Sequence, residues 1–395
     1  MSTLLHGAAA IVSGRLEEPL LVADSILIRD SIIVGVGSFA ELAQENPDEI
    51  IDVKGGVIAP GLVDPHTHPV LGDFTPRQNT LGWVTAHLNG GVTTLISAGE
   101  THWPGRQRTP IGAKSIAMAA AQSSLELRPG GAKVRGGALL IEPGLTEADF
   151  DDMDEAGVRY VGEIGLGTSI DPERIRGPVE MARARGWVIP MHVGGASVPG
   201  SHVVGSELAL ALEPDVVSHA NGGPTARPFS EILDIINHTD AAIEVVQAGN
   251  TRALVRIASH LSNEGMLNRL QIGTDSPSGT GIMPLGILRT IAYCSAFAEI
   301  DPASVIACAT GVVSARYKLD GGVIQVGKPA DLVVLDVPRG GAGKTALESF
   351  SGGDAPAVAL VIVDGEIVVE RSRVTPPPRT QPVISARIPN VNTLK

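Results

Sequence analysis

The sequence predicts an α/β protein: a (β/α)8 TIM-like barrel that carries a small β-sandwich domain built from both chain termini. Three observations lead to this prediction: a repeated strand-then-helix pattern in the middle of the chain, period-two alternation at both flanks, and a composition suited to a large core. Apolar residues form 43% of the 395 residues and charged residues form 18%. This balance excludes general disorder.

The barrel prediction rests on the middle of the chain, where runs rich in Val and Ile alternate with Ala-, Glu- and Arg-rich stretches of helical character. The expected strand ends lie near His66, Glu100, Leu140, Glu163, His192, His219, Val246 and Asp275. The last five follow one another at intervals of 27 to 29 residues, close to the roughly 30 residues of one βα unit. Eight such units favour a closed barrel, in which the last residue of each strand faces the active-site end.

Both flanks of the barrel region alternate as strands with one buried face do. Examples are residues 32–34 near the start of the chain and residues 331–335 near its end. The simplest arrangement joins residues 1–58 and 322–374 into one β-sandwich, with the barrel formed by residues 59–321.

The end of the chain, residues 375–395, begins with three consecutive prolines and loses its periodicity. Proline-rich segments favour extended conformations, so we predict an extended tail. Two interpretations stay open, a frayed end and an arm that grips a neighbouring subunit.

Charge and composition exclude several classes of partner. The net charge is −13 and only 3% of residues are aromatic, which argues against nucleic acid and anionic membranes as partners. No apolar run reaches the length of a membrane span, and the start of the chain lacks a basic signal region. The two cysteines are too few for a disulfide scaffold or a thiolate zinc site. We therefore expect a soluble cytoplasmic protein.

Five of the expected strand ends carry potential metal ligands. His66 and His68 alternate along one strand, so both imidazoles point into the same cavity. Four imidazoles and two carboxylates on one rim are unfavourable without a cation to organise them. The complete set of candidate ligands is His66, His68, Glu163, His192, His219 and Asp275.

The chemistry of this ligand set limits the metal. Nitrogen and oxygen ligands without thiolate suit zinc, iron or manganese, and several imidazoles disfavour Mg²⁺ and Ca²⁺. Six ligands are too many for one open tetrahedral zinc site. We therefore predict two divalent transition-metal ions about 3.5–4 Å apart, and the sequence does not distinguish among the three metals.

Three motifs resemble the amidohydrolase superfamily: Gly56–His68, Gly90–Thr94 and Gly327–Leu332. The resemblance covers nearly the whole chain, including both flanks. Many members of that superfamily have a carboxylated lysine that bridges the metals, whereas this chain has Glu163 there. The resemblance implies one metal held by His66, His68 and Asp275, a second held by His192 and His219, and Glu163 as the bridge.

Within that superfamily the chain resembles the enamidase family of cyclic amide hydrolases. The resemblance lies in strand-end loops, where substrates are selected: residues 76–78, 96–99, 104–106, 161–168, 221–226, 277–281 and 284–289. It implies hydrolysis of 6-oxo-1,4,5,6-tetrahydronicotinate to 2-formylglutarate and ammonia in nicotinate degradation. It also implies a homotetramer.

The expected catalytic residues are Asp275 and Glu163. Two metal ions would lower the pKa of a bridging water, and Asp275 would accept its proton and pass it to the leaving nitrogen. Such a substrate carries a carboxylate, which arginine binds best. The candidate substrate-binding residues are Arg77, His102, Arg106, Asn221, Asn250 and Ser276. Ion pairing elsewhere remains the alternative for the two arginines, and local turn capping remains the alternative for the two asparagines and Ser276.

Two other functions stay open. Another binuclear cyclic amidohydrolase or an aminopurine-type deaminase would use the same barrel ligands, and only the loop residues would separate them. A protein that retains the fold for assembly, without catalysis, belongs to a different class. It is disfavoured because all six ligand positions are intact.

Overall fold

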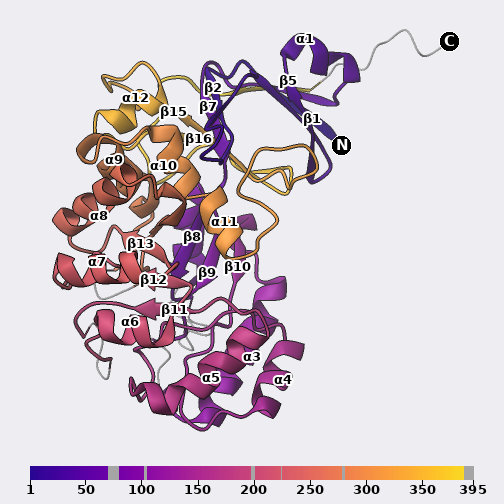
Figure 1. The fold of residues 1–395 in the computed structure, drawn as a ribbon. Helices are drawn as coiled ribbons and strands as arrows, with labels where there is room; N and C mark the ends of the chain where they lie inside the picture. The colour runs from indigo at the N-terminus through magenta and orange to yellow at the C-terminus, as the bar shows by residue number, and fades with distance from the viewer. Residues whose placement is uncertain (70–79, 102–104, 197–200, 224, 278–280, 387–395) are drawn as a thin grey trace.

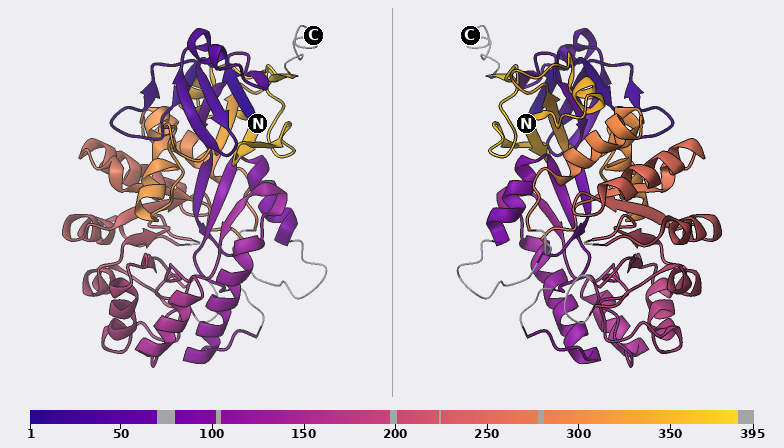
Figure 2. Two further views of the ribbon diagram at one scale, coloured as in Figure 1. Left: turned by 90° about the vertical axis from the view of Figure 1, so that its right-hand side faces the viewer. Right: turned by 90° about the vertical axis from the view of Figure 1, so that its left-hand side faces the viewer.

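The computed structural model describes residues 1–69, 80–101, 105–196, 201–223, 225–277 and 281–386 (Figure 1). Strands from both ends of the chain lie together at one end of the molecule, and the middle of the chain forms the larger helix-covered body (Figure 2).

The first sheet of the small domain combines N-terminal strands with one strand from the end of the chain. Its order is β18-β6-β1-β4-β5. The strands are β1 (Ser2–His6), β4 (Ser25–Arg29), β5 (Ile32–Gly37), β6 (Glu49–Asp52) and β18 (Val383–Ala386). Ser38 caps the short helix α1 (Phe39–Leu42), which is followed by the 3-10 turn η1 (Ala43–Glu45).

The second sheet interleaves the two ends of the chain in the order β17-β16-β15-β7-β2-β3. Its strands are β2 (Ala10–Val12), β3 (Leu20–Leu21), β7 (Val57–Pro60), β15 (Leu332–Asp336), β16 (Ala357–Val363) and β17 (Glu366–Val369). Alternate apolar residues of both sheets, including Leu5, Ile26, Ile58 and Leu360, form one buried cluster. The period-two pattern of the sequence therefore corresponds to a packed sandwich.

Part of the tail forms a strand of the first sheet. Strand β18 pairs antiparallel with β6, from Val383 opposite Asp52 to Ala386 opposite Glu49. Two β-branched residues open this strand, and β-branched side chains pack well on a pleated sheet. Part of the tail therefore extends the sandwich of its own chain.

In the described part of the larger domain, seven short parallel strands and one connecting segment follow one another around a ring. The strands are β8 (Leu62–Thr67), β9 (Val92–Ser97), β10 (Lys133–Arg135), β11 (Pro190–His192), β12 (Val216–Ser218), β13 (Ala242–Val246) and β14 (Leu270–Gly273). Isolated bridges of Leu139 with Val161 and of Tyr160 with Val188 connect β10 to β11. The backbone N–H of Asp275 donates to the carbonyl of His66 (3.0 Å), which joins the last strand to the first.

Helices alternate with these strands and lie on the outside of the ring (Figure 1). They are α2 (Thr80–Asn89), α3 (Pro110–Glu126), α4 (Glu147–Glu155), α5 (Pro172–Ala184), α6 (Ser206–Leu212), α7 (Phe229–His238), α8 (Thr251–Asn263), α9 (Gly286–Phe297), α10 (Pro302–Cys308) and α11 (Gly311–Arg316). Shorter elements are η2 (Pro129–Gly131), η3 (Leu267–Arg269) and α12 (Ala346–Ser351). Within the described residues, no helix has the length and apolarity needed to cross a membrane.

The floor of the barrel is a packed apolar layer. Residues from the starts of the strands, among them Val63, Val188 and Val216, form a buried cluster with Val313 and Tyr317 of the α11 region. This layer closes the N-terminal end of the strands. The open rim is therefore the carboxyl end, where barrel enzymes carry their sites.

Candidate metal centre

The structure brings the six predicted metal ligands together at this rim. They come from β8, from the segment before β11, and from the ends of β11, β12 and β14. All six residues are at most 8% exposed. Ligand atoms lie within 4.8 Å of one another in three overlapping groups: His66 with His68 and Glu163, His66 with His219 and Asp275, and Glu163 with His192 and His219.

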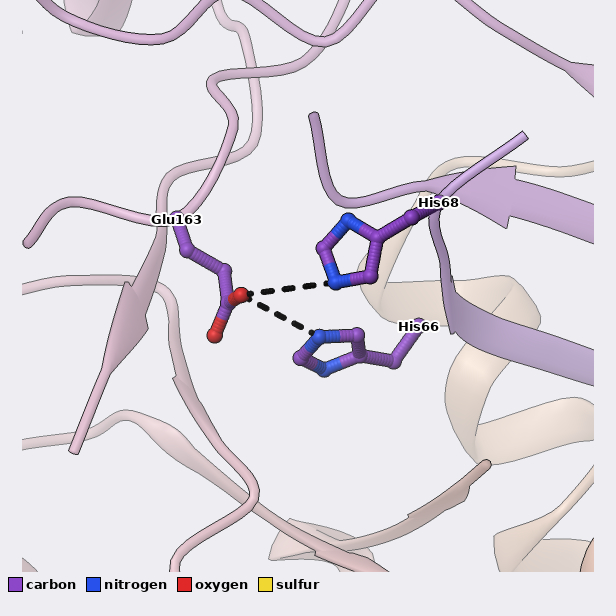
Figure 3. A group of neighbouring side chains, drawn as sticks. All are labelled: His66, His68 and Glu163. Atoms are coloured by element: carbon purple, nitrogen blue, oxygen red, sulfur yellow. Dashed lines mark ion pairs between the residues drawn. The ribbon is translucent and has the colours of Figure 1, made fainter. Parts of the chain in front are cut away.

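Glu163 lies between two pairs of histidines. Its Oε2 atom is 3.3 Å from Nε2 of His66 and 3.7 Å from Nε2 of His68 (Figure 3). Its Oε1 atom is 2.9 Å from Nε2 of His219 and 3.9 Å from Nδ1 of His192. Each carboxylate oxygen thus faces a different pair, which is the geometry of a carboxylate that bridges two cations.

Asp275 completes the side of the centre that contains His66 and His68. Its Oδ1 atom is 3.5 Å from Nε2 of His66 and 3.3 Å from Nε2 of His68. Its side chain is 12% exposed, against 2% for Glu163. Of the two carboxylates, Asp275 is therefore more exposed to solvent than Glu163.

Each of the four imidazoles has one nitrogen held by an acceptor outside the centre. His68 Nδ1 donates to the carbonyl of Gly99 (2.8 Å), His192 Nε2 donates to that of Gly195 (2.9 Å), and His219 Nδ1 donates to that of Val193 (3.2 Å). His66 Nδ1 instead donates to the carboxylate of Glu244 (2.7 Å). These bonds turn the opposite nitrogen of every ring toward the centre, as in metal-ligating histidines.

The inward-facing nitrogen and oxygen atoms are arranged to bind divalent cations and not to form hydrogen bonds with one another. Nδ1 of His192 and Nε2 of His219 are 3.1 Å apart, although the outer bonds leave a lone pair on both. Nε2 of His66 and Oε1 of Glu163 are buried without a hydrogen-bond partner among the described residues. A cation between these atoms would satisfy the lone pairs together.

Burial and neighbouring charges shift the pKa values of several of these side chains. Burial opposes ionisation of Glu163, but His66 and His219 hold the pKa of this carboxyl well below its usual range. Burial disfavours the charged form of His66, but Glu163, Glu244 and Asp275 raise the pKa of its imidazole well above the ordinary value. Burial lowers the pKa of His192 to about 4, with a further contribution from His219. The pKa of each of these side chains therefore depends on the charges of its neighbours.

The backbone around the centre is held in an unusual conformation. His219 has φ of 31° and Asp275 has φ of 56°, both in the left-handed region that non-glycine residues seldom adopt. Asp64, which is fully buried, accepts from the backbone N–H of His66 (3.2 Å) and of Thr274 (3.1 Å). Burial raises the pKa of Asp64 to about 7. Through these two hydrogen bonds, Asp64 connects the end of β8, which carries His66, to the segment after β14, which carries Asp275.

Of the predicted substrate-binding residues Arg77, His102 and Arg106, the structure describes only Arg106. Arg77 and His102 lie outside the described residues. Arg106 is half-buried, and its Nη2 donates to the carbonyl of Leu166 (3.2 Å). That bond holds it beside the segment that carries Glu163. Burial, together with Arg108, lowers the pKa of the Arg106 guanidinium, and a bound carboxylate would offset this effect.

The side-chain amide of Asn221 bonds to the backbone at both of its polar atoms. Its side chain is fully buried. Its Nδ2 donates to the carbonyl of Val246 (2.8 Å), and its Oδ1 accepts from the N–H of the same residue (2.9 Å). These two bonds connect the loops after β12 and β13, and the hydrogen bond from Asn221 to a lactam stays a prediction.

Asn250 and Ser276 also have local partners. Asn250 is the N-cap of α8, and its Oδ1 accepts from the N–H of Ala253 (3.0 Å). Ser276 is fully buried, and its Oγ accepts from the N–H of Met283 (3.2 Å). Helix capping and turn formation account for these two bonds, and substrate binding by either residue stays a prediction.

Sequence reasoning missed Glu244, which is fully buried in β13. A signal was present, because Glu244 is the one charged residue in the apolar run of residues 242–246. A carboxylate inside a buried strand requires a partner. The partner, His66, is 178 residues away in the chain.

The chain has relatives over almost its whole length. Residues 234–368 match the model of the amidohydrolase family. The enamidase of Eubacterium barkeri is 43% identical over 375 residues, covering 95% of this chain and 97% of that protein. A dihydroorotase of Syntrophotalea carbinolica is 24% identical, covering 92% of this chain and 99% of that protein.

The fold has a close counterpart among solved structures. A crystal structure of an enamidase, described as a new member of the amidohydrolase superfamily, matches with a TM-score of 0.93 at 43% identity, covering 98% of this chain and 100% of that one. The fold and the likeness together define a TIM-barrel hydrolase. The chain belongs to the amidohydrolase family, and the predicted fold class and the resemblance to enamidases are confirmed.

Proposed function

We propose that this chain, a hydrolase of carbon–nitrogen bonds, acts on a cyclic amide and that its substrate is 6-oxo-1,4,5,6-tetrahydronicotinate. The observation that carries the proposal is the convergence of six metal-ligating side chains in a chain similar to an enamidase over 95% of its length. The products would be 2-formylglutarate and ammonia, which places the reaction in nicotinate degradation.

The centre suits two divalent metal ions. Amidohydrolases generally bind such ions, and the ligand set favours zinc, iron or manganese over harder cations. The two faces of Glu163 support a binuclear arrangement. The proposed ligands are His66, His68 and Asp275 for one ion, His192 and His219 for the other, and Glu163 for both.

The bound ions would activate a water molecule and polarise the amide carbonyl. The protein's part in this step is proton transfer. Asp275 faces His66 and His68 through Oδ1, and we assign Oδ2 to accept the proton of the attacking water. The same carboxyl then protonates the ring nitrogen as the carbon–nitrogen bond breaks.

The remaining steps follow from the chemistry of the substrate. Opening the ring consumes one water and yields an enamine, because the released nitrogen is attached to a carbon–carbon double bond. The enamine tautomerises to an imine, and a second water releases ammonia and leaves the aldehyde of 2-formylglutarate. No oxidant or reductant takes part.

A carboxylate on the substrate requires a cationic partner. Arg106 is the described candidate, because its guanidinium is half-buried beside the Glu163 segment with one backbone acceptor, Leu166. Arginine binds a carboxylate through two parallel hydrogen bonds. Arg77 and His102 remain proposals for the same pocket.

We propose a cytoplasmic homotetramer with a sandwich of residues 1–58 and 322–374 and a barrel of residues 59–321. The tail, residues 375–395, contributes the sandwich strand β18.

The direct test is to mix metal-loaded protein with 6-oxo-1,4,5,6-tetrahydronicotinate and to follow ammonia release and loss of the enamide absorbance together. We expect both signals, with one ammonia per ring opened. An Asp275→Asn variant should lower kcat by about 10²–10⁴-fold. No reaction in protein that holds two metals would contradict the proposed substrate, and ammonia released from an aminopurine would support a deaminase instead.

A further inference from the structure

We propose that Glu244 is a positioning residue that couples the two halves of the metal centre by orienting His66 and fixing the backbone of His219. The inference rests on the proposed metal site. It assigns a role in metal affinity to a residue that would itself contact neither metal nor substrate.

Glu244 occupies a position where packing alone favours an apolar side chain. Residues 242–246 of β13 are all buried, and Glu244 is fully buried among them. A buried carboxylate is unfavourable unless strong donors compensate it. An apolar residue of similar size would fill the strand without this cost, so the carboxylate must be explained by its partners.

Both partners of the carboxylate belong to candidate metal ligands. Oε1 of Glu244 accepts from Nδ1 of His66 (2.7 Å) and from the backbone N–H of His219 (3.0 Å). His66 faces Asp275, whereas His219 lies next to His192. One oxygen atom therefore joins ligands from both halves of the centre.

His66 is distinguished from the other three imidazoles by this contact. Their outer nitrogens donate to backbone carbonyls, whereas that of His66 donates to a carboxylate. A charged acceptor makes the stronger hydrogen bond and increases the basicity of the opposite nitrogen. Glu244 thus fixes the ring of His66 and makes its Nε2 atom a better ligand.

The second contact acts on the backbone. His219 has φ of 31°, a conformation that surrounding interactions must maintain. Its N–H is held by Glu244, and its Nδ1 is held by the carbonyl of Val193. Without Glu244, the turn after β12 would lose the bond that sets the direction of the His219 side chain.

Gly273 of the neighbouring strand β14 leaves space for the side chains of His66 and Glu244. A Cβ atom added to Gly273 would lie 3.0 Å from Cβ of His66 and 3.2 Å from Cδ of Glu244. Both distances are shorter than ordinary van der Waals contacts. The absence of a side chain at Gly273 therefore allows β14 to pass behind the pair.

The test compares Glu244→Met, which removes both hydrogen bonds and the charge, with Glu244→Gln, which retains one carbonyl acceptor. The readouts are zinc bound per chain after dialysis, zinc affinity by chelator competition, and the melting temperatures of the metal-free and loaded proteins. We expect Glu244→Met to weaken zinc binding by about 10–100-fold, with Glu244→Gln between it and the wild type.

The matched control is Glu142→Gln. Glu142 is 1% exposed, and its Oε2 accepts from the backbone N–H and the hydroxyl of Thr168. Thr168 is not a proposed metal ligand, so this variant should keep wild-type zinc affinity. If the wild type bound no zinc, the proposed metal site itself would fail. Wild-type affinity in a folded Glu244→Gln or Glu244→Met variant, even with a lower melting temperature, would overturn the positioning role. If Glu244→Met does not fold, Gly273→Ala should lower zinc affinity by displacing the same pair without removing any ligand.

Discussion

Glu163 lies 2.9 Å from His219 through one carboxylate oxygen, while its other oxygen faces His66 and His68 at the end of β8. This relationship joins two ligand groups that come from opposite parts of the barrel. It makes Glu163 the residue on which a two-metal arrangement depends.

Replacing Glu163 with glutamine should remove the bridge. The amide would offer one acceptor oxygen and would turn its NH₂ group toward nitrogens that carry lone pairs. Since the loss of an outer partner alone costs about 10–100-fold, we expect kcat to fall by at least ~100-fold. Metal analysis should find fewer than two ions per chain. Two tightly held ions with unchanged kcat would contradict the bridging role.

Arg106→Ala should weaken binding of an acidic lactam more than it slows the reaction. A charge-assisted contact contributes about 1.5–3 kcal/mol, so we expect KM to rise by roughly 10–100-fold with little change in kcat. Arg252→Ala, at an exposed position on α8, is the control and should leave KM unchanged. Equal KM values for all three proteins would remove Arg106 from the substrate pocket.

His87 predicts a pH dependence of stability. It is fully buried on α2, its Nδ1 donates to Trp83, and burial lowers its pKa to about 4 from an ordinary 6.5. Between these values the unfolded chain binds a proton that the folded chain does not. The free energy of unfolding should therefore fall as the pH drops from 6.5 toward 4, by about 3 kcal/mol in total from this group.

Urea unfolding of His87→Leu at pH 5 and pH 8 measures this contribution. The difference between the two pH values should be smaller in the variant than in the wild type. His238→Leu is the matched control, because His238 makes the same bond to the carbonyl four residues earlier but is exposed on α7. An unchanged pH difference in His87→Leu would contradict the assignment.

Lys133 joins the barrel to the sandwich. Its Nζ lies 2.7 Å from Asp331 and 2.6 Å from Asp364, with side-chain exposures of 14% for Lys133 and 7% for Asp331. Removing one member of a buried pair leaves an uncompensated charge, so Lys133→Met should destabilise the protein by about 3–5 kcal/mol. Lys114→Met breaks a more exposed pair with Asp149 and should cost about 1 kcal/mol or less. Equal decreases in the free energy of unfolding for the two variants, measured with denaturant, would contradict a stabilising role for the ion pairs of Lys133.

The six proposed ligands could be predicted because each depends on local information. A strand has a recognisable end, and the carboxyl ends of barrel strands meet at one rim. The period of two along a strand placed His66 and His68 together. These regularities need no knowledge of which strands are neighbours.

Glu244 and Asn221 could not be predicted in the same way. Glu244 acts through His66, across the barrel interior from β13 to β8. Asn221 pairs both ends of its amide with the backbone of Val246, and no sequence pattern fixes the direction of an amide. Strand β18 was missed because an isolated four-residue edge strand after a proline run has little periodicity.

The proposed hydrolytic centre needs two metal ions for activity. The most direct measurement is a titration of metal-free protein with zinc, with ammonia release from 6-oxo-1,4,5,6-tetrahydronicotinate as the readout. We expect activity to be absent without zinc and to reach its maximum at two equivalents per chain. Full activity at one equivalent, or in the metal-free protein, would contradict it.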